Sequence, residues 1–192
     1  MPDLLLASSS PYRRTLLERL GLPFICAAPD IDETPAANES PEQLTQRLAL
    51  DKARALAERY PQHLIIGSDQ VLLLDGQSVS KPGTHAAAVA QLQRCSGRTV
   101  RFTTALCLLN SATDRYQLIS EPFDVSFREL SDETIERYLQ REQPYDCAGS
   151  FRMEGLGISL FRSLRGDDPN SLIGLPLIRL CEMLRNEGLE LP

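Results

Sequence analysis

A short buried strand that runs directly into a capped helix is the feature that most constrains this sequence. Residues 4–8 form an apolar strand ending in serine, and Ser10 followed by Pro11 marks a helix N-terminus, because serine favours the N-cap and proline the first helical position. Leucines then recur at helical spacing over residues 16–20, before Gly21 ends the pattern. A strand that feeds a helix in this way indicates an α/β architecture.

The remaining chain alternates between strand and helix signals. Ser40 and Gln43 form a capping box, and the pair Asp75-Gly76 predicts a tight hairpin. We expect one domain over residues 1–192, or two lobes around one cleft, with flanking helices on a twisted sheet that is neither wholly parallel nor wholly antiparallel. Strands are expected over 24–28, 64–66, 71–74, 99–109, 116–120 and 123–127, helices over 41–59, 84–97, from Ser131 and over 175–185, and a glycine-rich connection over 149–157.

Composition excludes several classes of protein. The chain is 42% hydrophobic and 24% charged, which is typical of a globular protein, and its net charge of −6 gives no general attraction for nucleic acid. No basic region precedes the first apolar run, and no stretch reaches the ~20 apolar residues of a membrane helix. The five cysteines contain no C-x-x-C pair, so we expect reduced, mostly buried thiols in a cytoplasmic protein.

Two arginines stand in the first turn of the expected N-terminal helix. Arg13 and Arg14 oppose the positive end of the helix dipole, and such unfavourable choices tend to mark function. Free main-chain N–H groups, serine hydroxyls and a guanidinium together suit a phosphate group. A pair of solvated arginines on an exposed turn is the alternative, with about equal weight at this point.

Charged residues at two further places are locally ambiguous. Lys52 interrupts an apolar helical stripe, so its ammonium either reaches solvent or enters a polar cleft. Asp69 follows a buried strand, where α/β proteins commonly place reacting groups. A two-residue hairpin loop would place Lys81 opposite Gln70, and a three-residue loop opposite Asp69, although a simple cross-strand ion pair is the alternative.

Acidic residues suggest a cation site, and one of them lies in a flexible loop. Glu33 is the carboxylate that we pair with Asp69 for a divalent cation, because Mg²⁺ usually takes one or two carboxylates plus substrate phosphates. The glycine-rich segment 149–155 carries one base and one acid, Arg152 and Glu154.

Seven stretches, in order along nearly the whole chain, resemble the Maf family of nucleoside-triphosphate pyrophosphatases, whose fold is Maf or ITPase-like. They are LLLASSSPYRRTLLERLG, DIDETP, ESPEQLTQRLALDKARALA, LIIGSDQV, SKPGTHAAAVAQL, CAGSFRMEG and DPNSLIGLPL. The resemblance implies an α/β fold with a deep cleft, a homodimer, and hydrolysis of nucleotides between the α and β phosphates with a divalent metal cation (Mg, Mn or Co). The partner is then a small-molecule nucleotide, with no nucleic acid and no membrane.

The resemblance also implies roles for single residues. Asp69 matches the catalytic proton acceptor, and Glu33 matches an acidic position near the metal. The phosphate-contacting positions correspond to Ser8, Arg13, Lys52 and Lys81.

Three further positions resemble those of the branch that hydrolyses 7-methyl-GTP to 7-methyl-GMP and pyrophosphate, a step in clearing modified nucleotides. They are Tyr12, Gln70 and Glu154, although tryptophan often replaces the tyrosine in that branch. An aromatic ring can stack on the cationic methylated base, and a carboxylate can accept hydrogen bonds from guanine. Two alternatives remain at this point: a Maf pyrophosphatase for dTTP or UTP, and a septum-formation regulator that senses nucleotides without turnover.

Overall fold

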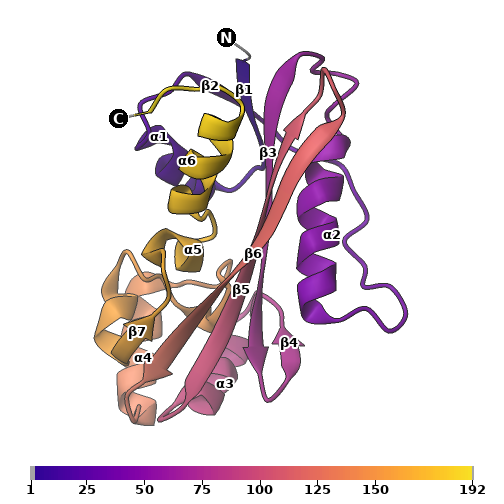
Figure 1. Ribbon diagram of the computed structural model, residues 1–192. Helices are drawn as coiled ribbons and strands as arrows, with labels where there is room; N and C mark the ends of the chain where they lie inside the picture. Colours follow the sequence, from indigo (N-terminus) through magenta and orange to yellow (C-terminus); the bar gives the residue numbers. More distant parts are fainter. Residues whose placement is uncertain (1–2, 192) are drawn as a thin grey trace. The chain divides into compact units, whose positions relative to one another are not determined.

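A computed structural model describes residues 3–191 and confirms a mixed α/β architecture (Figure 1). The sheet has the strand order β2-β1-β3-β5-β6-β7, and β4 pairs with β3. Strand β1 is parallel to β2 and β3, whereas β4 is antiparallel to β3 and β7 is antiparallel to β6. The strands are β1 (Asp3–Ala7), β2 (Phe24–Ala27), β3 (His63–Leu74), β4 (Gln77–Val79), β5 (Thr99–Asn110), β6 (Arg115–Phe127) and β7 (Phe161–Arg165).

The expected helix N-caps are confirmed, whereas the last helix, expected from residue 175, begins at Leu177. Ser10, Thr84 and Ser131 each accept a main-chain N–H bond at a helix N-cap. Ser40 and Gln43 form both hydrogen bonds of the capping box. The helices are α1 (Pro11–Glu18), α2 (Pro41–Arg54), α3 (His85–Cys95), α4 (Asp132–Glu142), α5 (Pro169–Ile173) and α6 (Leu177–Asn186), with 3₁₀ turns η1 (Ala148–Ser150) and η2 (Leu156–Leu160).

Several expected boundaries were wrong. Helix α2 ends at Arg54 rather than near residue 59, because the next turns close with i→i−3 bonds, from the N–H of Leu56 and of Ala57. The expected strands 64–66 and 71–74 are one strand, β3, and likewise 116–120 and 123–127 are both parts of β6. Strand β7 and helix α5 were not expected from the sequence.

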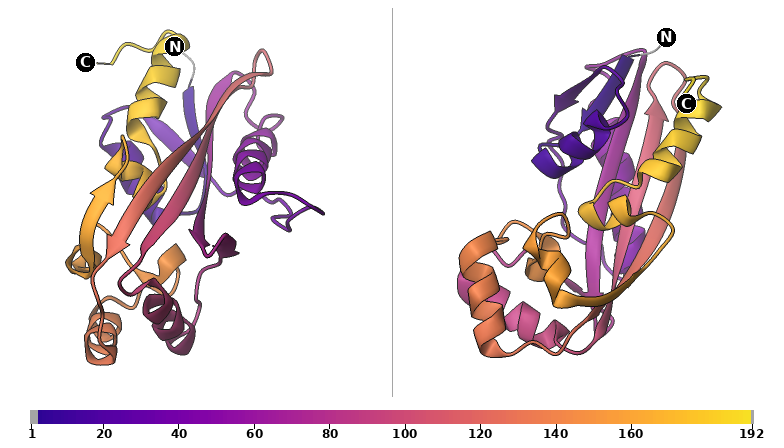
Figure 2. Two further views of the ribbon diagram at one scale, coloured as in Figure 1. Left: turned by 60° about the horizontal axis from the view of Figure 1, so that its bottom comes forward. Right: turned by 90° about the vertical axis from the view of Figure 1, so that its left-hand side faces the viewer.

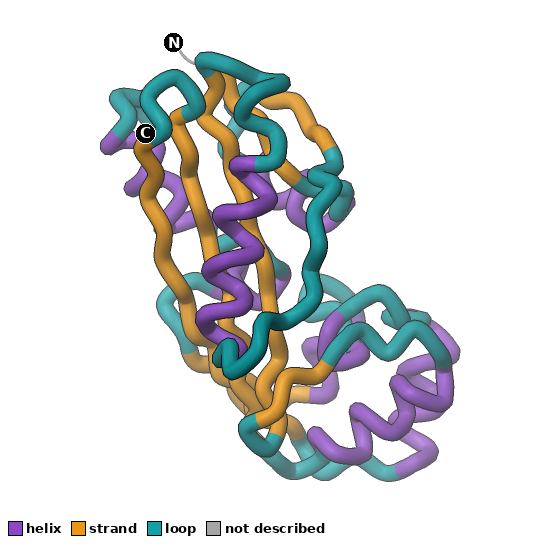
Figure 3. The backbone as a smooth tube through the Cα atoms, turned by 90° about the vertical axis from the view of Figure 1, so that its right-hand side faces the viewer, coloured by secondary structure: helices purple, strands orange, loops and turns teal. Residues whose placement is uncertain are grey.

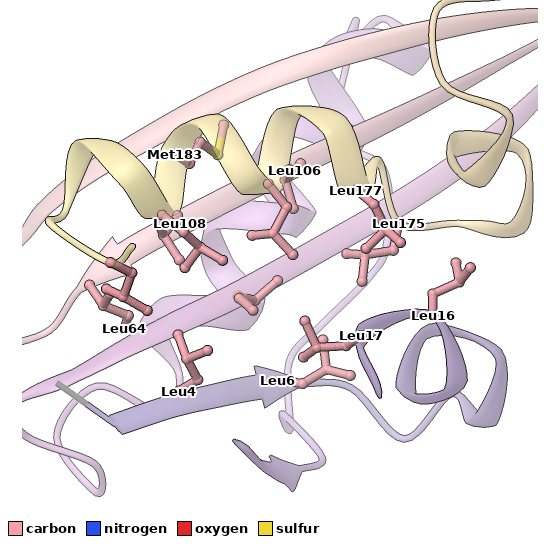
Figure 4. Close-up of a cluster of buried hydrophobic side chains, with 14 residues drawn as sticks. Leu4, Leu6, Leu16, Leu17, Leu64, Leu106, Leu108, Leu175, Leu177 and Met183 are labelled. Carbon is pink, nitrogen blue, oxygen red and sulfur yellow. The ribbon is translucent and has the colours of Figure 1, made fainter. Parts of the chain in front are cut away.

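The chain divides into two compact units, and the strands β3, β5 and β6 contribute residues to both. Among the described residues, unit 1 comprises 3–70, 104–121 and 170–191, and unit 2 comprises 71–103 and 122–169. In unit 1, helices α1 and α6 cover one face of the sheet (Figure 2, right), and α2 covers the other (Figure 3). Figure 4 shows the apolar cluster under α1 and α6, which includes Leu6, Leu17, Leu106 and Met183.

Unit 2 is built around aromatic side chains. Phe151 makes edge-to-face contacts with Phe102, Phe127 and Phe161, and its ring centroid lies 4.8 Å from that of Phe161. Helices α3 and α4 pack against each other in this unit. The segment expected to be only a glycine-rich connection therefore contributes a core residue, because Phe151 is buried.

All five cysteines are free thiols, as expected, but the expectation that most are buried was wrong. Cys95 and Cys107 are buried, Cys26 is exposed, and Cys147 and Cys181 lie in between. Burial raises the pKa of the Cys95 thiol to about 11 and that of Cys107 to about 12, so both stay protonated at neutral pH. Over residues 3–191, no helix combines the length and the apolarity needed to cross a membrane.

Candidate functional site

Two neighbouring parallel strands bring polar residues of unit 1 to the same level. Leu6 of β1 pairs with Ile66 of β3, so Ser8 and Ser68 each follow that pair by two residues. Helix α1 begins just after β1, and β3 continues through Asp69. The carboxyl ends of parallel strands are where α/β proteins place ligands, and the sequence-predicted residues of unit 1 gather here.

A glycine sets the distance between α2 and β3. A Cβ atom added to Gly67 would lie 2.0 Å from the main-chain oxygen of Ala49 and 3.2 Å from the nitrogen of Ala53. Only a glycine permits this close approach of a helix to a strand. This close approach allows nearby residues of the two elements, Lys52 on α2 and Asp69 on β3, to make contact.

Lys52 links two carboxylates. Its Nζ lies 2.7 Å from Oδ1 of Asp69 and 2.8 Å from Oε1 of Glu33. The side chains of Lys52 and Asp69 are 9% and 15% exposed, and that of Glu33 is 58% exposed. The lysine therefore does not reach into solvent but enters a polar cluster, one of the two alternatives that the sequence left open.

The two arginines of α1 differ in their surroundings. Arg14 pairs with Glu18 on the surface, at 3.1 Å, as a solvated arginine would. Arg13 donates from Nε to the main-chain oxygen of Gly174 at 2.8 Å. Burial lowers the pKa of the Arg13 guanidinium, and the carboxylates of Asp69 and Glu33 oppose that shift. Within residues 3–191 nothing accepts a hydrogen bond from its Nη atoms, which remain available to an anion.

Serines shape the turn between β1 and α1. Ser8 is buried, and its Oγ accepts a hydrogen bond from the N–H of Ser10 at 3.1 Å. Ser10 in turn accepts from the N–H of Arg13 at 3.4 Å. The turn thereby fixes the start of α1, where Tyr12 is half-buried.

Gln70 is held by its amide nitrogen. Nε2 donates to the main-chain oxygens of Ser171 at 2.8 Å and Leu172 at 3.1 Å, and lies 2.9 Å from Oγ1 of Thr104. Carbonyl oxygens only accept, so the amide nitrogen must face them, and Oε1 must point the other way. The sequence patterns assign no role to Thr104, Ser68 or residues 171–174, although the matching stretch DPNSLIGLPL contains that segment.

Lys81 and Glu154 belong to unit 2, and both are exposed. The two-residue form of the hairpin loop is confirmed, because Leu74 pairs with Gln77. The ladder ends at the pair Leu72–Val79, so the expectation that the same register continues to Lys81 was wrong. The roles of Lys81 in binding phosphate and of Glu154 in selecting the base stay predictions.

The carboxylates of Glu33 and Asp69, the pair expected to hold a divalent cation, lie on either side of the Lys52 ammonium. Oxygens of Glu33 and Asp69 converge on a single point, the Lys52 ammonium, and oxygen ligands are those that Mg²⁺ prefers. No group of three or more His, Cys, Asp or Glu side chains suited to a metal occurs in the described part of the chain, residues 3–191. A cation here would therefore take further ligands from a bound phosphate or from water.

An α/β protein with arginine and lysine beside carboxylates at parallel strand ends is equipped to bind an anionic ligand and transfer a proton. Residues 3–187 match the model of the family described as Maf-like protein, and the chain belongs to the Maf family. It is 60% identical, over all 192 residues and 100% of each relative, to proteins of Pseudomonas aeruginosa, Pseudomonas savastanoi and Pseudomonas syringae. Each of these relatives is named 7-methyl-GTP pyrophosphatase.

Proposed function

We propose that this protein hydrolyses 7-methyl-GTP to 7-methyl-GMP and pyrophosphate. The observation that carries the proposal is the contact of Lys52 with Asp69 and Glu33 in a chain 60% identical to three proteins of that name. The cluster combines a carboxylate that can accept a proton with the Lys52 ammonium. Hydrolysis of a phosphoanhydride is helped by a proton acceptor for the attacking water and by positive charge beside the phosphates.

Asp69 is the proton acceptor in this proposal. Its Oδ1 contacts Lys52, whereas Oδ2 takes no hydrogen bond from residues 3–191 and is open to water. The water oxygen attacks a phosphorus atom of the α–β anhydride and the bridging P–O bond breaks, which yields 7-methyl-GMP and pyrophosphate. The proton of the water passes to Asp69.

Basic side chains hold the phosphates. Arg13 offers its Nη atoms, and Lys52 offers an ammonium that is already desolvated. Within residues 3–191 the Ser8 hydroxyl donates no hydrogen bond, so it can donate to a phosphate oxygen. Lys81 is the proposed fourth contact. Fixed positive groups of this kind stabilise the charge that develops on the leaving pyrophosphate.

Three residues select the base. Tyr12 stacks on the methylated guanine, whose positive charge favours an aromatic face. Glu154 accepts from N1–H and the exocyclic amine and offsets the positive charge of the base. Gln70 presents its Oε1 to the base, because Nε2 is already engaged. Pyrimidines lack the cationic ring and would bind less well.

Glu33 and Asp69 are the residues that would hold a divalent cation, such as Mg²⁺, Mn²⁺ or Co²⁺, which would supply positive charge to the phosphates. We further propose that the protein works in the cytoplasm as a homodimer, on the resemblance of its sequence to Maf proteins. Light scattering on the purified chain tests the dimer, and a monomer at micromolar concentration would contradict it.

Pyrophosphate release from 7-methyl-GTP, GTP, dTTP, UTP and CTP, each with Mg²⁺, Mn²⁺ or Co²⁺, tests the activity. We expect 7-methyl-GTP to give the highest kcat/KM. Comparable or faster turnover of UTP would instead assign the protein to the pyrimidine branch. Binding of nucleotide without pyrophosphate release with any metal would favour a nucleotide sensor.

A further inference from the structure

Residues 171–174 of unit 1 offer three main-chain oxygens to side chains of the candidate site. The oxygen of Ser171 accepts from Thr104 and from Gln70, and that of Leu172 accepts from Gln70. The oxygen of Gly174 accepts from Arg13 and from Ser68. A single segment therefore holds both the residue proposed to select the base and a residue proposed to bind phosphate.

Thr104 completes a closed set of bonds around Gln70. Its hydroxyl donates to the oxygen of Ser171 at 2.8 Å and accepts from Nε2 of Gln70 at 2.9 Å. Thr104 is 1% exposed, so water cannot replace these bonds. The two hydrogens of Nε2 face three oxygens, those of Ser171, Leu172 and Thr104, so loss of the hydroxyl would leave the amide held by the main-chain oxygens alone. The amide plane could then tilt, which would shift Oε1 relative to the base.

Ser68 contacts the same segment next to Arg13, a residue proposed to bind phosphate. Its hydroxyl lies 2.9 Å from the oxygens of both Ala105 and Gly174, which ties β3 to β5 and to the segment. The Gly174 oxygen also receives Nε of Arg13 at 2.8 Å. A Cβ atom at Gly174 would lie 3.3 Å from that Nε, so the guanidinium lies directly against this residue.

We infer that Thr104 and Ser68 are positioning residues that act through the 171–174 segment, Thr104 on Gln70 and Ser68 on Arg13. The inference rests on the proposed function. It separates two properties: Thr104 sets preference for the methylated base, and Ser68 sets the affinity for phosphate. Neither residue contacts the reacting atoms in this proposal.

The test compares Thr104→Val with Ser68→Ala, using two readouts. The first is the ratio of kcat/KM for 7-methyl-GTP to that for GTP, and the second is the inhibition constant of inorganic pyrophosphate. For Thr104→Val we expect the ratio to fall about tenfold, the effect of about one lost buried hydrogen bond, with pyrophosphate inhibition unchanged. For Ser68→Ala we expect pyrophosphate inhibition and KM for both nucleotides to weaken by a similar factor, with the ratio unchanged.

Two further variants separate positioning from packing. Thr104→Ser keeps the hydroxyl and should restore the ratio. Thr103→Val is the matched control, because Thr103 is also buried, at 7% exposure, yet its hydroxyl forms no hydrogen bond within residues 3–191. Thr104→Ala repeats the measurement if the valine variant does not fold, as judged by circular dichroism.

The outcomes distinguish the two proposals. If the wild-type protein does not prefer 7-methyl-GTP to GTP, the proposed function fails, and the inference fails with it. If the wild type shows the preference and Thr104→Val or Thr104→Ala retains it, the inference alone is overturned. Equal changes of both readouts in the Thr104 and Ser68 variants would also overturn it, because they would indicate a general loss of structure.

Discussion

Nζ of Lys52 lies 2.7 Å from Oδ1 of Asp69, in a contact where both side chains are largely removed from solvent. The lysine comes from α2 and the aspartate from β3, which Gly67 allows to approach closely. The Lys52 ammonium thus lies beside the carboxylate that we propose as the proton acceptor, and the two residues can be tested separately.

Replacing Asp69 with asparagine should abolish turnover but not binding. The amide keeps the size of the side chain and can still accept from Lys52, but it cannot take a proton from water. We expect kcat for 7-methyl-GTP to fall at least about 100-fold, with the dissociation constant of the nucleotide changed by less than about tenfold. Single-turnover assays and calorimetric titration measure the two quantities.

Asp51→Asn is the matched control for that change. Asp51 lies on α2 and pairs with Arg47 at 3.3 Å, outside the proposed machinery. It should retain activity. If Asp69→Asn keeps more than about a tenth of wild-type kcat, Asp69 is not the proton acceptor.

Replacing Lys52 with methionine should lower stability and increase the response to a divalent cation. Without the ammonium, the carboxylates of Asp69 and Glu33 lose their shared partner. We expect a loss of about 2 kcal/mol in the free energy of unfolding, below the range for a fully buried pair because Glu33 is exposed. Mg²⁺ should then raise the Tm of the variant more than that of the wild type.

Arg54→Met controls for loss of a positive charge on the same helix. Arg54 is exposed and lies over the ring of Tyr116, 5.3 Å from its centroid. The Arg54→Met change should alter the free energy of unfolding by less than about 1 kcal/mol and leave the Mg²⁺ response as in the wild type. An equal Mg²⁺ response in all three proteins would argue against a cation site at Glu33 and Asp69.

Local chemistry made much of the fold predictable. Serine N-caps and the Asp75-Gly76 turn act within a few residues, so the sequence alone located the starts of α1, α2 and α4 and the hairpin. Strand β3 was harder to predict, because the polar run from Ser68 to Gln70 lacks an apolar pattern. Those polar groups are satisfied by distant partners on β5 and in the 171–174 segment, which no local pattern could show.

The candidate site was predictable only as separate pieces. Lys52 was ambiguous on its helix, and its contact with Asp69 depends on how α2 packs on β3. The resemblance to Maf proteins singled out these residues together, but it assigned no role to Thr104 or Ser68. Their part is visible only once the main-chain oxygens of 171–174 have been placed.

Replacing Gly67 with alanine should destabilise unit 1. The new Cβ would lie 2.0 Å from a main-chain oxygen of α2, so the helix must move away from β3. We expect a loss of about 2 kcal/mol or more in the free energy of unfolding, together with reduced activity, since Lys52 moves with the helix. Urea denaturation and the pyrophosphate assay measure these effects.

Gly21→Ala separates steric contact from backbone strain. Gly21 has a φ of +66°, and a Cβ there would meet nothing within 4 Å. It should cost about 1 kcal/mol with activity retained. If Gly67→Ala is no more destabilising than Gly21→Ala, the close approach of α2 to β3 is not required.

The pairing of Glu39 with Arg47 should make stability depend on pH in the acid range. Glu39 accepts hydrogen bonds from Arg47 Nε at 2.7 Å and Nη2 at 2.9 Å, and these bonds, with one from the N–H of Ala36, lower its pKa from 4.5 to about 2. A carboxyl with a lowered pKa in the folded state stabilises it above the unfolded pKa and loses that contribution as pH falls through the folded value. Glu39→Gln should therefore be less stable than the wild type at pH 6, and the difference should shrink as pH falls from about 4.5 towards about 2. Urea denaturation at several pH values measures this, with Glu58→Gln as the control, because Glu58 is exposed and forms no ion pair within residues 3–191. A difference that stays constant over that range would mean that the charge of Glu39 is not what stabilises the loop before α2.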